Sequence, residues 1–94
     1  MLDRLSDWER FSRKVKRHIE EYTIPQYQSE DNTADQVGAY CSEDCVRAIN
    51  RYTARFKRNS RGNLEQLRDM LKIAHYAQFA YDKLKDELGE SDVY

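Results

Sequence analysis

The side chains best suited to chemistry in this sequence are arginines that recur at helical spacing between Cys45 and Asn63. This segment contains six basic residues and no acidic one: Arg47, Arg51, Arg55, Lys57, Arg58 and Arg61. At about 100° per residue, the four arginines spaced three or four positions apart fall within an arc of about 80° on a helix. A guanidinium binds a phosphate or a carboxylate through two parallel hydrogen bonds. The pattern therefore predicts an anion-binding face made of Arg47, Arg51, Arg55, Arg58 and Arg61.

The anion that such a face would hold is a nucleic acid or an acidic protein surface. The same pattern also has a simpler explanation, because cations near the C-terminal end of a helix are favoured by the helix dipole. The alternative to an anion-binding face is therefore an ordinary solvated helix face. If the first helix lies alongside, it would extend the basic face through Arg10, Arg13, Lys14 and Arg17.

A metal site is not expected from the cysteines and histidines. Cys41 and Cys45 are the only cysteines, and His18 and His75 are the only histidines. Each histidine stands alone on its own predicted helix, whereas a structural zinc site needs four converging ligands. We expect Cys45 to be a small core residue instead.

An enzyme is the alternative to a binding protein. Glu65 with Asp69, and Asp82 with Asp86, form i,i+4 carboxylate pairs of the kind that hold magnesium in helical nucleotide hydrolases. Neither pair completes a two-metal site, and the sequence contains no phosphate-binding loop. We therefore expect no catalytic residue and no cofactor, and we keep a nucleotide-processing or nucleotide-sensing protein as the alternative.

The composition favours one small helical domain. The chain has 94 residues, a formal net charge of −1, 35% charged residues, three glycines and one proline. Few helix breakers and many straight-chain charged residues are typical of helices. No apolar run is long enough to cross a membrane, and the N-terminus lacks the apolar core of a signal peptide. A reducing, cytoplasmic setting is expected.

Hydrophobic periodicity predicts an all-α protein, a three-helix bundle with helices at about residues 6–24, 42–58 and 63–88. The expected N-caps are Ser6, Ser42 and Asn63, and Pro25 should end the first helix. Residues 25–41 should form a long acidic linker and residues 89–94 a tail.

The third helix should lie at the centre of the bundle, because its apolar arc of about 160° is wide enough for two neighbours. The predicted core consists of Trp8, Phe11, Val15, Ile19, Val46, Ile49, Phe56, Leu67, Leu71, Ala74, Tyr81 and Leu84. Apolar residues left over on this helix would favour a homodimer, unless the linker covers them. These residues are Met70, Ile73, Tyr76, Leu84 and Leu88.

Two stretches, SEDCVRAINRY at 42–52 and LRDMLKIAHY at 67–76, resemble small bacteriophage and prophage proteins of unknown function. In those families a helix of the form A-I-K-Y-x-x-R precedes a short basic turn, and a helix of the form D-L-x-K-A-x-x-Y follows. The resemblance covers about residues 42–84 and implies a phage or prophage context and a two-helix core. It implies no catalytic residue, and it points to Arg51 and residues 55–58 as the match to the basic helix end and turn.

Overall fold

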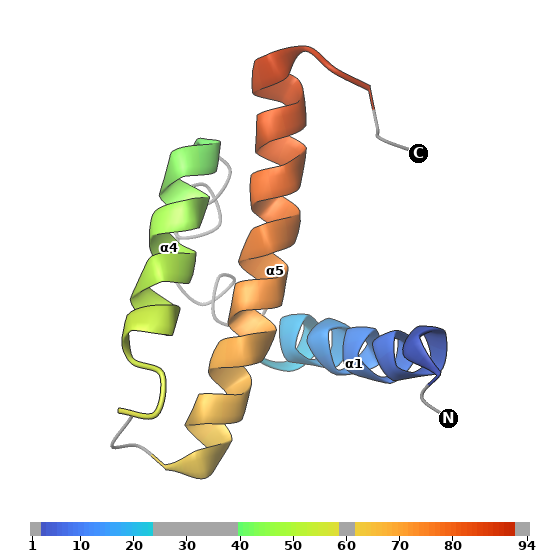
Figure 1. The fold of residues 1–94 in the computed structure, drawn as a ribbon, viewed down its shortest axis with the longest axis vertical. Coiled ribbons are helices and arrows are strands. Elements are labelled where there is room, and N and C mark those ends of the chain that lie inside the picture. Colours follow the sequence, from blue (N-terminus) through green and yellow to red (C-terminus); the bar gives the residue numbers. More distant parts are fainter. Residues whose placement is uncertain (1–2, 24–39, 59–61, 92–94) are drawn as a thin grey trace. The chain divides into compact units, whose positions relative to one another are not determined.

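The computed structural model describes residues 3–23, 40–58 and 62–91, and within these ranges all regular structure is helical (Figure 1). The elements are the α-helices α1 (Arg4–His18), α4 (Ser42–Ala54) and α5 (Asn63–Leu88), with a π-helical turn, η1 (Ile19–Thr23), continuing α1. The all-α prediction is confirmed for the described part of the chain. None of its helices is long and apolar enough to cross a membrane.

The chain divides into two compact units, Met1–Val37 and Gly38–Tyr94, where the sequence predicts one domain. The first unit contains α1 and η1, and the second contains α4 and α5. Residues 25–39 of the predicted linker at 25–41, which include Pro25, lie outside the described residues, as do Arg61 and residues 92–94 of the predicted tail.

The N-cap of α1 is Asp3, so the prediction of Ser6 as the cap is wrong. The Asp3 carboxylate accepts the backbone N–H groups of Leu5 and Ser6 at 3.1 and 3.2 Å. The Ser6 hydroxyl donates to the same carboxylate at 2.8 Å and is the main cause of the lowered pKa of Asp3. A carboxylate can accept all three bonds at once, whereas a serine hydroxyl inside the first turn cannot replace it.

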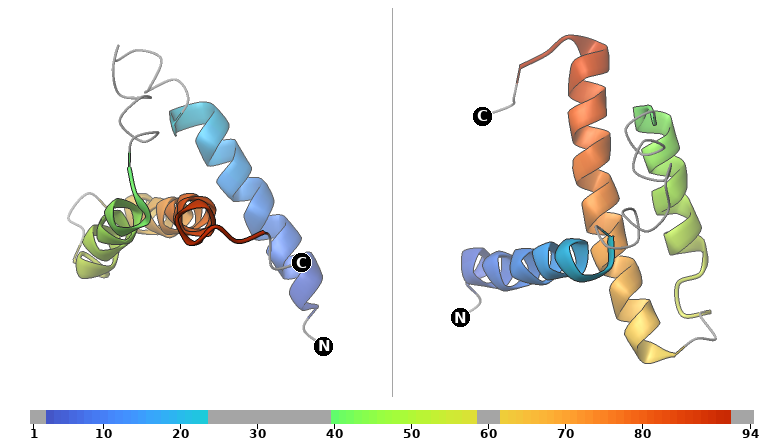
Figure 2. Two further views of the ribbon diagram at one scale, coloured as in Figure 1. Left: turned by 90° about the horizontal axis from the view of Figure 1, so that it is seen from above. Right: turned by 180° about the vertical axis from the view of Figure 1, so that it is seen from behind.

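In the second unit, α4 and α5 lie side by side and run in opposite directions (Figures 1 and 2). Cys45 and Ala48 on α4 are fully buried, and the ring centroids of Tyr52 and Tyr76 lie 5.9 Å apart. Burial raises the pKa of the Cys45 thiol. The prediction of Cys45 as a small core residue is confirmed, and two small buried side chains suit a close helix–helix approach.

The N-cap of α4 is Cys41 rather than the predicted Ser42. Asp44, three residues further on, accepts the Cys41 backbone N–H at 3.0 Å and its thiol at 3.3 Å. The backbone bond is the main reason why the pKa of Asp44 is lowered. Ser42 instead donates its N–H to Glu87 of α5 at 3.4 Å, which ties the start of α4 to the end of α5.

Helix α4 ends at Ala54, four residues before the predicted boundary. Two i→i+3 hydrogen bonds follow, from Phe56 N–H to Thr53 O at 3.1 Å and from Arg58 N–H to Arg55 O at 2.9 Å. Lys57 adopts a left-handed conformation with φ of 58°. The chain therefore turns away from the helix axis before residue 58, and Arg55 and Arg58 belong to this turn.

Helix α5 spans Asn63–Leu88, as the periodicity predicts, but its N-cap is Gly62 rather than Asn63. Gly89 ends it in the left-handed region, with φ of 67°. The Gly89 N–H donates to Asp86 O and the Glu90 N–H donates to Lys85 O, both at 3.1 Å. This pair of bonds is the Schellman motif, which glycine adopts without steric cost.

Six of the predicted core residues are exposed, so the predicted core is wrong at these positions. The exposed fractions are 60% for Trp8, 47% for Val46, 57% for Phe56, 65% for Leu67, 43% for Tyr81 and 46% for Leu84. Five of these residues belong to the α4–α5 unit, where a helix pair buries only the line along which the two helices touch and apolar residues on the flanks stay accessible; Trp8 is on α1. The other six predicted core residues are partly accessible.

We predict that Lys57→Gly raises the free energy of unfolding by about 0.5–1 kcal/mol, because glycine removes the steric cost of a left-handed conformation. Urea denaturation followed by circular dichroism measures the change. Lys57→Ala is the matched control, since it removes the same side chain and keeps the strain. Equal stability of the two variants would contradict the prediction.

Candidate anion-binding site at the basic end of the helix pair

The C-terminal end of α4 lies beside the N-terminal half of α5 (Figure 1), and the described residues of both segments are rich in arginine and lysine. We call this region the basic end and define it by the described residues 51–58 and 62–75. It contains six cations and two carboxylates, a net charge of +4, although the whole chain has a net charge of −1. The cations are Arg51, Arg55, Lys57, Arg58, Arg68 and Lys72.

At the centre of the basic end, Arg55 binds Asp69 of α5 through two hydrogen bonds. Arg55 Nε lies 2.9 Å from Asp69 Oδ2, and one terminal Nη lies 2.7 Å from Oδ1. The Asp69 side chain is 4% exposed and that of Arg55 is 37% exposed. This bond raises the pKa of Arg55. A buried carboxylate needs a cationic partner, so Arg55 first of all joins the end of α4 to α5.

Tyr52 provides an aromatic platform beside this pair. The Arg55 guanidinium carbon lies 4.9 Å and the Lys72 Nζ 5.5 Å from the centroid of the Tyr52 ring. Both distances suit cation–π attraction. Burial raises the pKa of Tyr52, so its hydroxyl stays protonated at neutral pH. The ring therefore helps to hold two cations in place.

Glu65 and Asp69, the carboxylate pair considered for magnesium, both contact cations. Glu65 accepts a bond from Arg68 at 2.8 Å, and Lys72 lies 3.9 Å from Glu65 and 3.7 Å from Asp69. A metal ion would have to displace these cations to reach the oxygens. Within residues 3–23, 40–58 and 62–91, no group of three or more histidine, cysteine, aspartate or glutamate side chains is arranged to hold a metal.

Arg47 differs from the rest of the arginine row because it lies in the N-terminal half of α4, beside acidic residues of the first turn. It pairs with Glu43 at 3.4 Å and Asp44 at 3.1 Å, both one turn earlier on the same helix. The Arg47 side chain is 66% exposed, and ion pairs at such accessible positions contribute little to stability. These acids reduce the positive potential at Arg47.

Arg51 and Arg58 are the open members of the row. Both are exposed, and neither forms a hydrogen bond through its side chain or an ion pair with another residue in the described ranges. They flank Arg55 in the sequence, so the fixed guanidinium lies between two accessible ones along the chain. Arg61, the fifth predicted residue, lies outside the described residues.

The cations of α1 belong to the first unit. There Arg10 pairs with Asp7, and Arg17 Nε donates to Glu21 at 2.7 Å. Arg13 and Lys14 are exposed. These α1 residues and the basic end are separate features of the two units.

Sequence reasoning missed Asp69 as the buried partner of Arg55. A signal was present, because Asp69 precedes Ile73, Tyr76 and Ala80 at spacings of four, three and four. An acid on an otherwise apolar line of a helix indicates a buried charge that needs a cation. The arginine that supplies it lies 14 residues away, and only the fold shows which one it is.

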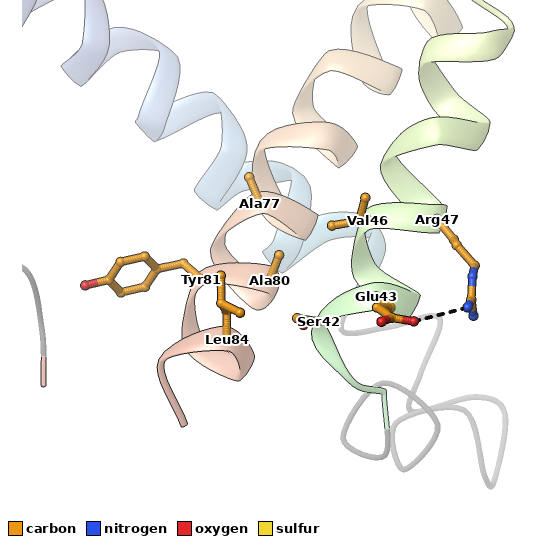
Figure 3. A pocket seen from close by; sticks show the side chains of 8 residues that line it. All are labelled: Ser42, Glu43, Val46, Arg47, Ala77, Ala80, Tyr81 and Leu84. Carbon is orange, nitrogen blue, oxygen red and sulfur yellow. Dashed lines mark hydrogen bonds and ion pairs between the residues drawn. The ribbon is translucent and has the colours of Figure 1, made fainter. Parts of the chain in front are cut away.

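An apolar groove lies at the opposite end of the pair, between the start of α4 and the C-terminal half of α5 (Figure 3). Its volume is about 560 Å³. It is lined by Ser42, Glu43, Val46, Arg47, Ala77, Ala80, Tyr81 and Leu84. Figure 3 shows the paired Glu43 and Arg47 on the α4 side of the groove and the two alanines on the α5 side.

No protein-family model and no curated protein matches the sequence, and no solved structure matches the fold. The functional assignment therefore depends on the chemistry of the basic end and of the groove.

We predict that Arg55→Ala lowers the free energy of unfolding by about 2–3 kcal/mol, because it leaves a buried carboxylate without its bidentate partner. Arg55→Lys should lose about 1 kcal/mol, since it keeps the charge and loses the second bond. Arg51→Ala removes an equal charge from an exposed position and should change stability by less than about 0.5 kcal/mol. Chemical denaturation measures all three, and similar losses for Arg51→Ala and Arg55→Ala would contradict the assignment.

Proposed function

We propose that this protein is a non-catalytic binding module that holds an anionic partner, a nucleic acid or an acidic protein, on its basic end. The main observation in support of this proposal is that Arg51, Arg55 and Arg58 have different environments. Arg55 is fixed by a buried carboxylate, while Arg51 and Arg58 are exposed without an ionic partner in the described ranges. Two accessible guanidiniums beside a third, fixed one suit an extended polyanion better than a small compact anion.

Charge and rigidity support the same proposal. The net charge of +4 at the basic end attracts an anion over a distance of about 10 Å at moderate salt. The bonds of Arg55 to Asp69 and of Arg68 to Glu65 hold these cations in place before a ligand arrives. In this proposal Arg51 and Arg58 make the direct contacts, and the Arg55–Asp69 pair holds the turn that contains Arg58 against α5.

The proposal includes four features that are predicted from the sequence. They are the three-helix bundle, the long acidic linker at 25–41, the cytoplasmic setting and the phage or prophage context. The last rests on the resemblance of residues 42–84 to small bacteriophage and prophage proteins.

The alternative is a nucleotide-processing or nucleotide-sensing protein, which would use Glu65 and Asp69 to hold magnesium. The contacts of Glu65 with Arg68, and of Asp69 with Arg55, favour binding without turnover instead. A screen of nucleoside triphosphates with magnesium, followed by phosphate and pyrophosphate release, separates the two. Turnover that Glu65→Gln abolishes would establish the alternative and remove the binding proposal.

We predict that the protein binds an oligonucleotide with an affinity that falls steeply as salt rises, because phosphate contacts release counterions. The double variant Arg51→Ala, Arg58→Ala should weaken binding and lower the salt slope by about 2, roughly one for each lost phosphate contact. Fluorescence anisotropy with labelled single-stranded and duplex DNA and with RNA, at several salt concentrations, measures both effects.

The matched control is Arg4→Ala, Lys16→Ala, which removes the same net charge from exposed positions of the first unit. It should leave the salt slope nearly unchanged. An equal loss in both double variants would show that only net charge matters and would contradict a site at the basic end. An absence of binding at low salt would remove the nucleic acid and leave the acidic protein as the partner.

A further inference from the structure

Helix α5 carries an apolar row on the flank beside its line of contact with α4, and several members of this row line pockets together with residues of α4 and the turn after it. Starting at Leu67, every residue at alternating steps of three and four is apolar through Leu88. We call this row the α5 seam, and its members are Leu67, Met70, Ala74, Ala77, Tyr81, Leu84 and Leu88. By contrast, Asp69 and Tyr76, which contact α4, belong to a neighbouring line of the helix.

The α5 seam is accessible over most of its length. Leu67 is 65% exposed, Leu84 46% and Leu88 64%. Tyr81 is 43% exposed, and Ala77 is also exposed. Single exposed apolar residues are ordinary on proteins, but a continuous row of them marks an interface.

The spacing of the α5 seam identifies the kind of surface that fits it. Steps of three and four average 3.5 residues, which is the repeat of helices that wind around each other with interlocking side chains. The row continues without interruption over seven positions, so its natural partner is another helix with the same repeat. The groove beside Ala77, Tyr81 and Leu84 gives such a helix a hollow in which to lie (Figure 3).

The charges of the α4–α5 unit identify that helix as α5 of a second copy. The basic end carries a net charge of +4, and the opposite end, residues 40–50 and 76–91, carries six acids and three cations, a net charge of −3. Two copies that run antiparallel bring the basic end of each onto the acidic end of the other. A parallel pair would instead place like charges together.

Side-chain sizes along the α5 seam set the register. In one antiparallel register, Ala77 lies opposite Tyr81 of the second copy, and Ala74 lies opposite Leu84. Met70 then lies opposite Leu88 near each end. Small residues face large ones in the two central layers, which is the arrangement that fills space between helices. We infer that the α5 seam is the interface of an antiparallel homodimer in this register.

The interface leaves Arg51 of the proposed anion site accessible, although the acidic end of the second copy offsets part of the positive charge of the basic end. Val46, which lines the groove, and Arg51 are five residues apart on α4, so their side chains point about 140° apart around the helix. The dimer therefore covers the Val46 side and leaves Arg51 accessible on both copies. This inference does not depend on the proposed function.

Sedimentation equilibrium from micromolar to millimolar concentration tests the dimer. The mass should rise from 11.3 kDa toward twice that value. Tyr81→Glu should raise the dissociation constant at least about tenfold, because it places a carboxylate between apolar side chains. The control Leu64→Glu lies on the same helix, off the α5 seam, at a residue that is 66% exposed, and should leave it unchanged. A mass fixed at 11.3 kDa, or equal effects of the two variants, would overturn the inference.

Mixing two variants tests the register, because two variants that each dimerise weakly should form a stronger heterodimer. Ala77→Lys and Tyr81→Glu should each form poor homodimers, because each places two uncompensated charges in the interface. An equimolar mixture should form heterodimers, since the introduced lysine and glutamate then face each other in one layer. Circular dichroism confirms that both variants are helical. No gain in mass on mixing would overturn the antiparallel register.

Discussion

The two hydrogen bonds between Arg55 and Asp69 are the interaction on which the rest of the α4–α5 unit depends. Asp69 is buried, and a buried carboxylate is tolerated only when a cation pairs with it. Arg55 supplies that cation from the turn that follows α4, and α4 ends at Ala54. The pair therefore links the point where the chain leaves α4 to the second turn of α5.

This single pair also divides the arginine row into parts with different roles. Arg55 is held by Asp69, and Arg47 is balanced by two acids of its own helix. Arg51 and Arg58 remain accessible, so the positive potential of the unit concentrates at one end. The acids of the first turn of α4 and the last turns of α5 collect at the other end. This segregation of charge attracts an anion to one end and also orients a second copy along α5, and the second copy's acidic end offsets part of the positive charge.

The sequence predicts the helices well, because their periodicity and breakers are local features. Helix α5 ends as predicted because Gly89 adopts, at no steric cost, the left-handed conformation that closes its last turn. The N-caps are less predictable from sequence, because neighbouring polar residues can each accept the free N–H groups of the first turn. Backbone geometry decides which of them does so. Asp3 replaced Ser6, and Cys41 with Asp44 replaced Ser42.

Burial and the candidate site were less predictable, because both depend on contacts between distant residues. The exposure of Phe56 and Leu67 follows from how narrow the line of contact between α4 and α5 is. The different environments of Arg51, Arg55 and Arg58 follow from Asp69, which lies 14 residues after Arg55. At the level of sequence the three arginines are equivalent. The anion-binding face stays a prediction, and the fold places Arg55 and Arg58 in the turn after α4 and shows that Arg51 and Arg58 are exposed.

The most direct test of this account follows the Nε–H signals of individual arginines by NMR during titration with an oligonucleotide. A guanidinium bound to a buried carboxylate should keep its signal, whereas accessible guanidiniums should shift as phosphate replaces water. We predict that the Arg51 and Arg58 signals shift as oligonucleotide is added and reach a plateau at saturation, while the Arg55 signal stays unchanged. Movement of the Arg55 signal with Arg51 and Arg58 unaffected would contradict it.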